Sequence, residues 1–325
     1  MASSDPLTQL RQFLTEGRFR EAVEWRQQAE TILSGRPEGR LLAATAATRL
    51  GEVELGRTDA TTALEEFRER ADRDGRMRCL NLLGAIAFEQ GDIVEARRCF
   101  GEVLFLAQEL QDPLVLARAS NNLASVAHLQ GETDEAVNMY RTALVAYTRL
   151  GDRRGAAETY HNLAMNFRQL ELWSDATDAT SQAVRHAELC DDPWLLSLVL
   201  TGKAELHLDM EDPALARSVL ERAEALAREA GDEIGIGEVH RIRGLVSLAE
   251  GQAERALDEA QQGMTIAKKS GSALLEGECA AVAARACRDL GRKDPLAKFR
   301  RIAEERFAVL GAVELLKDFR HTLSE

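Results

Sequence analysis

The sequence predicts an all-α protein, and three features of its 325 residues carry that prediction. Glycine recurs at a spacing of 40 residues, and a series of alanines with the same spacing lies five residues after the turn positions from 91 to 251. A third series with the same spacing holds only alanine or glycine. No segment alternates apolar and polar residues for long, so no sheet is expected. The three series are Gly51, Gly91, Gly131, Gly251 and Gly291; Ala96, Ala136, Ala176, Ala216 and Ala256; and Ala44, Gly84, Ala124, Ala164, Ala204, Gly244 and Ala284.

Each 40-residue unit is interpreted as two amphipathic helices joined by short turns. The small residues are expected where two helix backbones approach closely, with larger side chains such as Phe100 and Tyr140 filling the sides. Asp-Pro pairs are expected to begin helices, because Asp can cap a helix and Pro suits its first position. These pairs lie at 112–113, 192–193, 212–213 and 294–295.

The unbroken spacing predicts one continuous domain over residues 1–325, since a solenoid buries each repeat only against its neighbours. A charged segment at about 298–325, two helices long, is expected to cap its end. The approximate repeats are 6–35, 36–75, 76–115, 116–155, 156–195, 196–235, 236–275 and 276–311.

Composition excludes some classes of partner. The formal net charge of −13 opposes binding to nucleic acid or to an anionic membrane surface. No apolar run approaches the ~18 residues that a membrane span needs, and the N-terminus does not have the pattern of a signal peptide. The sequence therefore predicts a soluble, cytoplasmic protein.

The repeats resemble those of the tetratricopeptide repeat (TPR) family, in a 40-residue form. The family pattern of two small residues followed by an aromatic one is present as Ala124, Ala136 and Tyr140. The stretch "NNLASVAHLQGETDEAVNMYRTAL" resembles kinesin light chain, and "GDRRGAAETYHNLA" resembles the scaffold LGN and bacterial regulatory TPR domains. An N-terminal unit with Gly17 and Ala22 also fits. The resemblance covers roughly 6–311 and implies an α-solenoid, a right-handed superhelix of antiparallel helix pairs with about seven to eight repeats.

The sequence departs from the family pattern at two kinds of position. Glu171 and Glu211 stand where a turn glycine is expected, and Thr180 and Ala260 stand where an aromatic residue is expected. These departures leave the local geometry of those repeats open.

Nothing in the sequence indicates catalysis, a metal site or a cofactor. It contains no nucleophile-elbow, P-loop or zinc-protease motif, and its six histidines are scattered. His186 and Cys190 lie one helical turn apart, but two ligands alone are a weak sign of a metal. The protein is therefore predicted not to be an enzyme.

The family resemblance implies that the first helix of each repeat lines a concave surface, where we expect a partner to bind. At 100° per residue, Asn122 points away from the buried stripe of its helix, and Asn162 occupies the same position in the next repeat. An Asn amide can both donate to and accept from the backbone of an extended peptide. The predicted contact residues are Arg78, Asn81, Phe88, Arg118, Asn121, Asn122, Ser125, His128, Glu158, His161, Asn162, Met165, Arg168, Gln169 and Arg241.

Two functions are consistent with this surface. One is an adaptor or scaffold that binds an extended peptide or a helix of another protein, and the nearby Arg and His residues suggest an acidic one. The other is a regulatory sensor of the MalT or Rap kind, which binds a small molecule or signalling peptide and controls an effector in trans. The sequence leaves self-association through an end repeat open.

Overall fold

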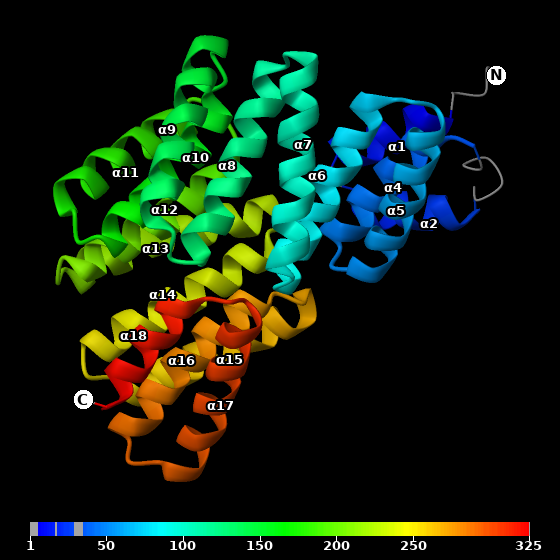
Figure 1. Ribbon diagram of the computed structural model, residues 1–325. Helices are drawn as coiled ribbons and strands as arrows, with labels where there is room; N and C mark the ends of the chain where they lie inside the picture. The colour runs from blue at the N-terminus through cyan, green and yellow to red at the C-terminus, as the bar shows by residue number, and fades with distance from the viewer. Residues whose placement is uncertain (1–5, 17, 29–34, 325) are drawn as a thin grey trace. The chain divides into compact units, whose positions relative to one another are not determined.

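Every element in the described part of the computed structural model, residues 6–16, 18–28 and 35–324, is a helix (Figure 1). This confirms the all-α prediction. None of the helices in those ranges is long and apolar enough to cross a membrane. The helices are α1 (Pro6–Thr15), α2 (Phe19–Gln28), α4 (Pro37–Arg49), α5 (Val53–Glu69), α6 (Arg73–Gln90), α7 (Ile93–Leu110), α8 (Pro113–Leu129), α9 (Thr133–Leu150), α10 (Arg153–Gln169), α11 (Trp173–Glu188), α12 (Pro193–Asp209), α13 (Pro213–Ala230), α14 (Glu233–Ala249), α15 (Ala253–Ser270), α16 (Ala273–Asp289), α17 (Lys293–Val309) and α18 (Val313–Ser324).

The chain divides into two compact units, Met1–Ala119 (unit 1) and Ser120–Glu325 (unit 2), and the division falls inside α8. Within unit 1, α4 packs against α5, and α6 packs against α7. Within unit 2, the antiparallel pairs are α10 with α11, α12 with α13, α14 with α15, and α16 with α17. One continuous domain over the whole chain stays a prediction.

The repeat is set by turns in the left-handed backbone region. Positive φ values recur every twenty residues, from Gly51 through Gly91 and Gly131 to Gly311. After such a residue the chain bonds back into the finished helix, as when the N–H of Asp92 donates to the carbonyl of Ala87 at 2.8 Å. This is the bond that ends a helix through a left-handed residue. Each helix therefore stops at a defined point and the chain reverses.

Glu171 and Glu211, which replace the expected turn glycines, take the same conformation, with φ values of 56° and 61°. The departure from the family pattern has therefore not altered the turn. A side chain with a Cβ is disfavoured there by roughly 1–2 kcal/mol, which the packing of the flanking helices must offset.

Aspartates that follow these turns begin the next helices. The carboxylates of Asp112, Asp192 and Asp212 accept backbone N–H groups in the first turns of α8, α12 and α13, as the Asp-Pro pairs predict. The fourth pair is a correction. Helix α17 already begins at Lys293, so Asp294 and Pro295 lie inside its first turn, where the missing N–H of Pro costs nothing.

The small residues lie where helices meet, as predicted. Ala124, Ala136, Ala204 and Ala216 are inaccessible to solvent. At Gly84 the approach is closer still, because a Cβ there would lie 2.6 Å from the ring of Phe100. The aromatic position of the repeat thus fills the space that glycine leaves.

The ends of the chain differ from a full repeat. At the N-terminus α1 and α2 pack on α4, with Ala22 buried between them, while Gly17 lies outside the described residues. At the C-terminus α17 pairs with α16 and completes the last repeat, so the cap is the single helix α18 and not two helices. Phe319 of α18 packs edge-on against Phe307 at 6.1 Å between ring centroids.

We expect Glu211→Gly to raise the free energy of unfolding by about 1 kcal/mol, because glycine takes a positive φ without a Cβ penalty. The reverse change, Gly251→Ala, is expected to lower it by about 1 kcal/mol. A Cβ at position 251 meets no atom within 4 Å, so the backbone alone decides the effect. Urea unfolding of both variants checks this, and equal stability of Glu211→Gly and the unmodified chain would contradict it.

A second matched pair tests the close helix approach. Gly84→Ala is expected to cost about 1–3 kcal/mol, since its Cβ overlaps the Phe100 ring. Gly101 lies in a helix interior, and a Cβ there meets no atom within 4 Å. Gly101→Ala is therefore expected to raise the free energy of unfolding by about 0.5–1 kcal/mol. Thermal melting of the two variants should therefore move in opposite directions.

Candidate functional site

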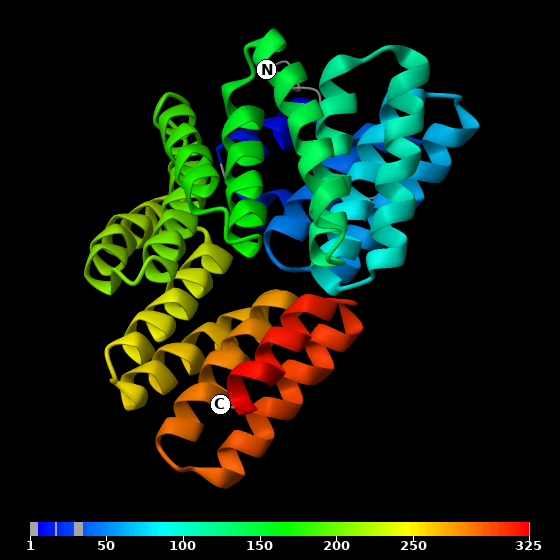
Figure 2. The same ribbon diagram turned by 60° about the vertical axis from the view of Figure 1, so that its left-hand side comes forward.

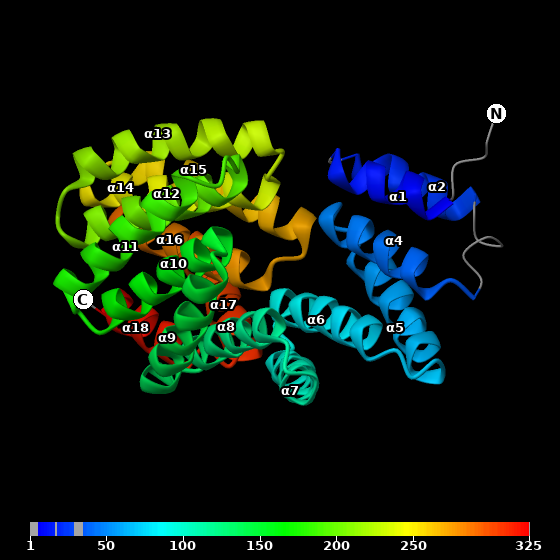
Figure 3. The same ribbon diagram turned by 90° about the horizontal axis from the view of Figure 1, so that it is seen from above.

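The first helices of unit 2 line the inner side of its curve. Helix α10 contacts α12, α12 contacts α14, and α14 contacts α16. Among the described residues, the second helices α11, α13, α15 and α17 make at most marginal contacts with one another. A stack that is tight along one row of helices and open along the other curves toward the tight row. The succession of helix pairs can be followed in Figures 2 and 3. We call the side lined by α8 from Ser120 on, α10, α12, α14 and α16 the inner face.

One row of side chains on this face is half-buried in every repeat, so water reaches it along the whole unit. It mixes a hydroxyl, two apolar side chains and two charged ones. The row consists of Ser125, Met165, Glu205, Leu245 and Arg285.

The repeat position that Asn122 and Asn162 occupy lies at the contact between neighbouring first helices. The amide of Asn162 lies 3.4 Å from Oδ1 of Asn121 and 3.5 Å from Oγ of Ser125, both on α8. The equivalent positions in later repeats are Ile242 and Val282, which are buried. Asn162 is half-buried and its amide contacts α8, and a contact of Asn162 with a ligand stays a prediction.

Gly202 occupies the same position in α12, where the ring of His161 leaves no room for a side chain. A Cβ at residue 202 would lie 2.5 Å from Cε1 of His161. The His161 ring is buried against this glycine, and burial lowers its pKa to about 4, so the ring is neutral at neutral pH. His161 therefore packs between α10 and α12, and its contact with a ligand stays a prediction.

Arg168 crosses from α10 to α12. Its guanidinium donates to Oε2 of Glu205 at 2.7 Å and to Oδ2 of Asp209 at 2.7 Å. The side chains of Arg168 and Glu205 are each 14% exposed. Of the basic side chains that suggested an acidic partner, Arg168 is thus neutralised within the chain.

Arg241 continues the chain of charges from α12 to α14 and α16. It donates to Oε1 of Glu205 at 2.9 Å and to Oε2 of Glu238 at 2.7 Å, and its Nε lies 3.5 Å from Oε2 of Glu278. Glu205 therefore bridges two arginines, one through each oxygen. We call Arg168, Glu205, Asp209, Arg241, Glu238 and Glu278 the charged ladder.

The charged ladder holds four carboxyl groups and two guanidinium groups, and its pKa values reflect that shortage of positive charge. Burial alone would raise the pKa of Glu205, but Arg168 and Arg241 lower it well below its ordinary value. Glu278 has only the longer contact with Arg241, and burial raises its pKa to about 8 with help from Glu238. One carboxyl of the ladder is therefore protonated at neutral pH.

Sequence reasoning missed Asp209 and Glu278 as part of the site, and it did not predict that Glu205 and Glu238 pair with Arg168 and Arg241. A signal for them exists in the spacing. Ser125 meets Asn162, Arg168 meets Glu205, and Arg241 meets Glu278, each at a separation of 37 residues. One repeat of 40 residues less one helical turn of 3.6 gives about this separation. Opposite charges 37 residues apart on first helices therefore predict inner-face pairs.

The other predicted residues are scattered. In unit 1, Arg78 is exposed and paired with Asp74 at 3.0 Å, Asn81 and Phe88 are half-buried, and Arg118 is exposed. In unit 2, Asn121 is buried and His128 is half-buried near Asn166, with its pKa lowered by burial. Asn122, Glu158 and Met165 are half-buried, and Gln169 is exposed.

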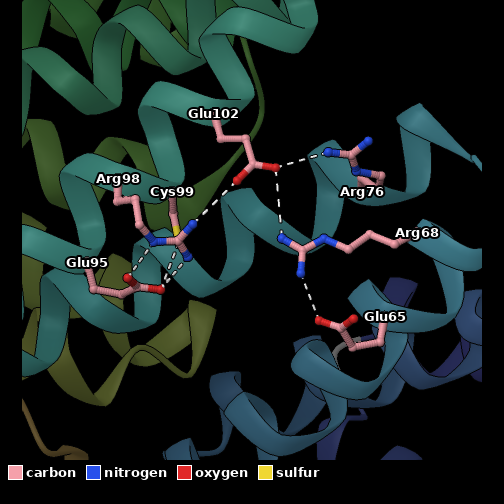
Figure 4. Close-up of polar contacts among 7 residues, drawn as sticks. All are labelled: Glu65, Arg68, Arg76, Glu95, Arg98, Cys99 and Glu102. Atoms are coloured by element: carbon pink, nitrogen blue, oxygen red, sulfur yellow. Dashed lines mark hydrogen bonds and ion pairs between the residues drawn. The ribbon is translucent and has the colours of Figure 1, made fainter.

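Unit 1 carries a separate polar network on α5, α6 and α7 (Figure 4). Glu102 accepts from Arg76 at 3.1 Å and lies within 4.0 Å of Arg68, and Arg98 approaches it at 3.4 Å. Burial raises the pKa of the neighbouring Cys99 thiol to about 12, so this thiol is not a nucleophile at neutral pH. The remaining members, Glu65 and Glu95, balance the charge of Arg68 and Arg98. This network binds three helices together and leaves no excess charge for a ligand.

Metal binding finds no support in the structure. No group of three or more His, Cys, Asp or Glu side chains in the described ranges is arranged to hold a metal ion. The His186–Cys190 pair is used otherwise, because Cys190 Sγ donates to the backbone carbonyl of His186 and the His186 ring stacks on Tyr160. Side chains fill the hollow between α10, α11 and α12 that His161 and Lys203 line, so that it holds no water-sized space.

Comparison with known proteins agrees with this geometry. Residues 115–188 match the family model described as tetratricopeptide repeat. The chain is therefore similar to TPR proteins over residues 115–188. Its fold is an all-α TPR solenoid of helix pairs. A specific likeness to kinesin light chain stays a prediction, and no curated protein sequence matches the chain.

Solved structures of TPR proteins share the fold at low sequence identity. A Rap protein complexed with competence and sporulation factor has a TM-score of 0.64 and 15% identity, over 98% of this chain and 95% of that one. The apo form of the quorum sensor NprR from B. thuringiensis has a TM-score of 0.66 and 10% identity, over 93% and 86%. The Cut9–Hcn1 hetero-tetramer structure has a TM-score of 0.60 and 18% identity, over 98% of this chain and 56% of that one.

Removing the central arginine of the charged ladder, Arg241, should lower the stability of unit 2. Arg241→Met is expected to lower the free energy of unfolding by about 3–5 kcal/mol, because it leaves Glu238 and Glu278 without a cation and Glu205 with Arg168 alone. Arg243→Met on the same helix is the control, since Arg243 pairs only with Glu224 and should cost about 1 kcal/mol or less. Urea denaturation followed by circular dichroism measures both, and equal losses would contradict the role of the ladder.

Glu278→Gln should change how stability depends on pH. Because the pKa of Glu278 in the folded chain, about 8, lies above its ordinary value of 4.5, its contribution to stability is complete below pH 4.5 and is lost as pH rises through 8. Gln mimics the protonated carboxyl, so the variant should melt at a higher temperature than the unmodified chain at pH 9. At pH 4 the two melting temperatures should differ little. A difference that is constant from pH 4 to pH 9 would contradict the assignment.

Proposed function

We propose that this chain is a non-catalytic binding protein that receives an extended peptide or a helix of another protein on the inner face of unit 2. The observation that carries the proposal is the row of half-buried side chains that runs through every first helix of that unit, from Ser125 to Arg285. A row that water reaches in every repeat offers contacts along a segment several residues long.

The chemistry of the inner face suits an amphipathic segment. Met165, Leu198 and Leu245 supply apolar contact, and Glu205 and Glu238 lie between them in the same rows. An apolar surface with charges at intervals selects a ligand by the placement of its side chains.

The charged ladder argues against the acidic ligand that the sequence suggested. Arg168 and Arg241 are paired with carboxylates of the chain, which outnumber them. A ligand carboxylate would have to compete with Glu205 for these guanidinium groups. We therefore infer a ligand that is neutral or basic where it lies against α12 and α14.

The inner face is rigid, so that binding a ligand costs little conformational entropy. Ion pairs and hydrogen bonds join α8 to α10, α10 to α12, α12 to α14, and α14 to α16. A surface already held in place loses little conformational freedom when a ligand arrives.

A regulatory sensor is the second candidate, and the structural neighbours favour it. The Rap structure is a complex with competence and sporulation factor, and NprR is described as a quorum sensor. By analogy of fold alone, the chain would bind a short free peptide and change its contact with an effector in trans. A change in the affinity for the effector when peptide binds separates this role from that of a simple adaptor.

The test is selection of a random peptide library on the full chain, followed by fluorescence anisotropy of the selected peptides. Met165→Ser combined with Leu198→Ser alters the inner face and should weaken binding ten-fold or more. Val145→Ser combined with Leu189→Ser makes the same chemical change at exposed positions elsewhere in unit 2 and should change affinity less than two-fold.

Selected peptides whose affinity is unaffected by the inner-face variant would refute the proposal. Adding Asn122→Ala tests the predicted amide contact separately. A further loss of affinity with unchanged melting would support a contact of Asn122 with the peptide backbone, which stays a prediction.

A further inference from the structure

Two neighbouring turns on one edge of unit 2 expose large apolar side chains. Leu170, Leu172 and Trp173 lie at the turn from α10 to α11, with 41%, 44% and 39% of their surface exposed. Met210 and Leu215 lie at the turn from α12 to α13, with 50% and 43% exposed. We call these five residues the edge patch. The corresponding turns at Gly131, Gly251 and Gly291 carry no exposed large apolar side chain.

The same two turns depart from the repeat in a second way. Among the turns of this edge in unit 2, only those at residues 171 and 211 have glutamate in place of glycine at positive φ. The left-handed conformation is less favourable for glutamate than for glycine, and unfavourable backbone conformations cluster where they serve a function. An exposed apolar cluster with polar neighbours is likewise a feature of interaction sites.

The two turns lie side by side. Arg168, at the end of α10, is bonded to Asp209, at the end of α12, so the residues that follow each of them begin next to one another. Helices packed in this way are about 8–10 Å apart. Two turns of an α-helix rise about 10.5 Å, so apolar residues seven apart on a helix would reach both turns.

The edge patch has a negative surround. Glu171, Asp175 and Glu211 are exposed, and Asp209 and Asp212 lie in the same two stretches. No lysine or arginine occurs in 169–175 or 209–215. The complement of this surface is an apolar stripe with cations beside it.

We propose that the edge patch docks a basic amphipathic helix of another protein. It lies at the turns and not on the inner face, so it is a second interaction surface in addition to the proposed peptide site. Leu172, Trp173 and Met210 supply the apolar contact, and Glu171 and Glu211 hold the cations of the partner. The patch consists of two short apolar clusters that are about one interhelix distance apart. Residues seven apart on a helix span this distance, so a helix contacts both clusters with one face.

The experiment uses two synthetic 18-residue amphipathic peptides, one of leucine and lysine and one with glutamate in place of lysine. Their binding to the full chain is followed by fluorescence anisotropy at low and at physiological salt. Leu172→Ser, Trp173→Ser and Met210→Ser together remove the apolar contact. Val145→Ser, Leu189→Ser and Val309→Ser together are the matched control, since all three are exposed and lie outside the edge patch.

We expect the edge-patch variant to bind the lysine peptide at least ten-fold more weakly and the control variant less than two-fold more weakly. Glu171→Gly with Glu211→Gly should weaken binding several-fold, reduce its salt dependence and raise the melting temperature. The glutamate peptide should not bind. The inner-face variant Met165→Ser with Leu198→Ser should keep full affinity, which separates this proposal from the proposed function.

Any of the following results would overturn the proposal. One is equal loss of affinity in the edge-patch and control variants, and no binding of either peptide would count equally against it. Another is loss of affinity in the inner-face variant alone, which would place the peptide on that face. A further one is sedimentation of the unmodified chain as a dimer that the edge-patch variant turns into a monomer, because a second copy of the chain would then cover the patch.

Discussion

The left-handed turn that follows each helix from α4 to α17 is the constraint on which the other features depend. Because a residue with positive φ stands every twenty positions from Gly51 to Gly311, each repeat is the same length. Equal repeats place equivalent residues of neighbouring first helices in a fixed relation. Close packing at Ala124, Ala136 and the other small positions requires this regularity, because one residue more or less would carry a large side chain into the contact.

The charged ladder is a consequence of that fixed relation. A guanidinium on one first helix meets a carboxylate about 37 residues later, and Glu205 then meets Arg241 in the following repeat. Buried ion pairs add little net stability, because removing the charges from water offsets their attraction. They do discriminate between arrangements, since a shifted repeat would leave several buried charges unpaired. We interpret the ladder as fixing how one repeat sits on the next.

Several polar side chains that the sequence predicted to contact a partner pair instead with neighbouring repeats. Side chains that looked available from the sequence, such as Asn162, His161 and Arg168, are occupied between repeats. What the inner face offers instead is a strip of half-buried residues on a rigid support. The carboxylates of the charged ladder outnumber its arginines, and the neutral or basic ligand that we propose rests on that excess.

The sequence by itself determined the helix pairs and the 40-residue repeat, and it indicated the resemblance to TPR proteins. These follow from local chemistry, since glycine marks the turns, aspartate caps the helices, and alanine permits the close contact. It did not determine the number of helices in the cap, because α17 is charged on its surface and packs as an ordinary second helix. Only the tertiary structure decided which inner-face residues meet. A helical wheel gives the direction in which Asn162 points from its own helix axis. It does not show that the neighbouring helix α8 lies in that direction and contacts the amide. The partner of a side chain depends on the shift between helices, which a single repeat does not contain.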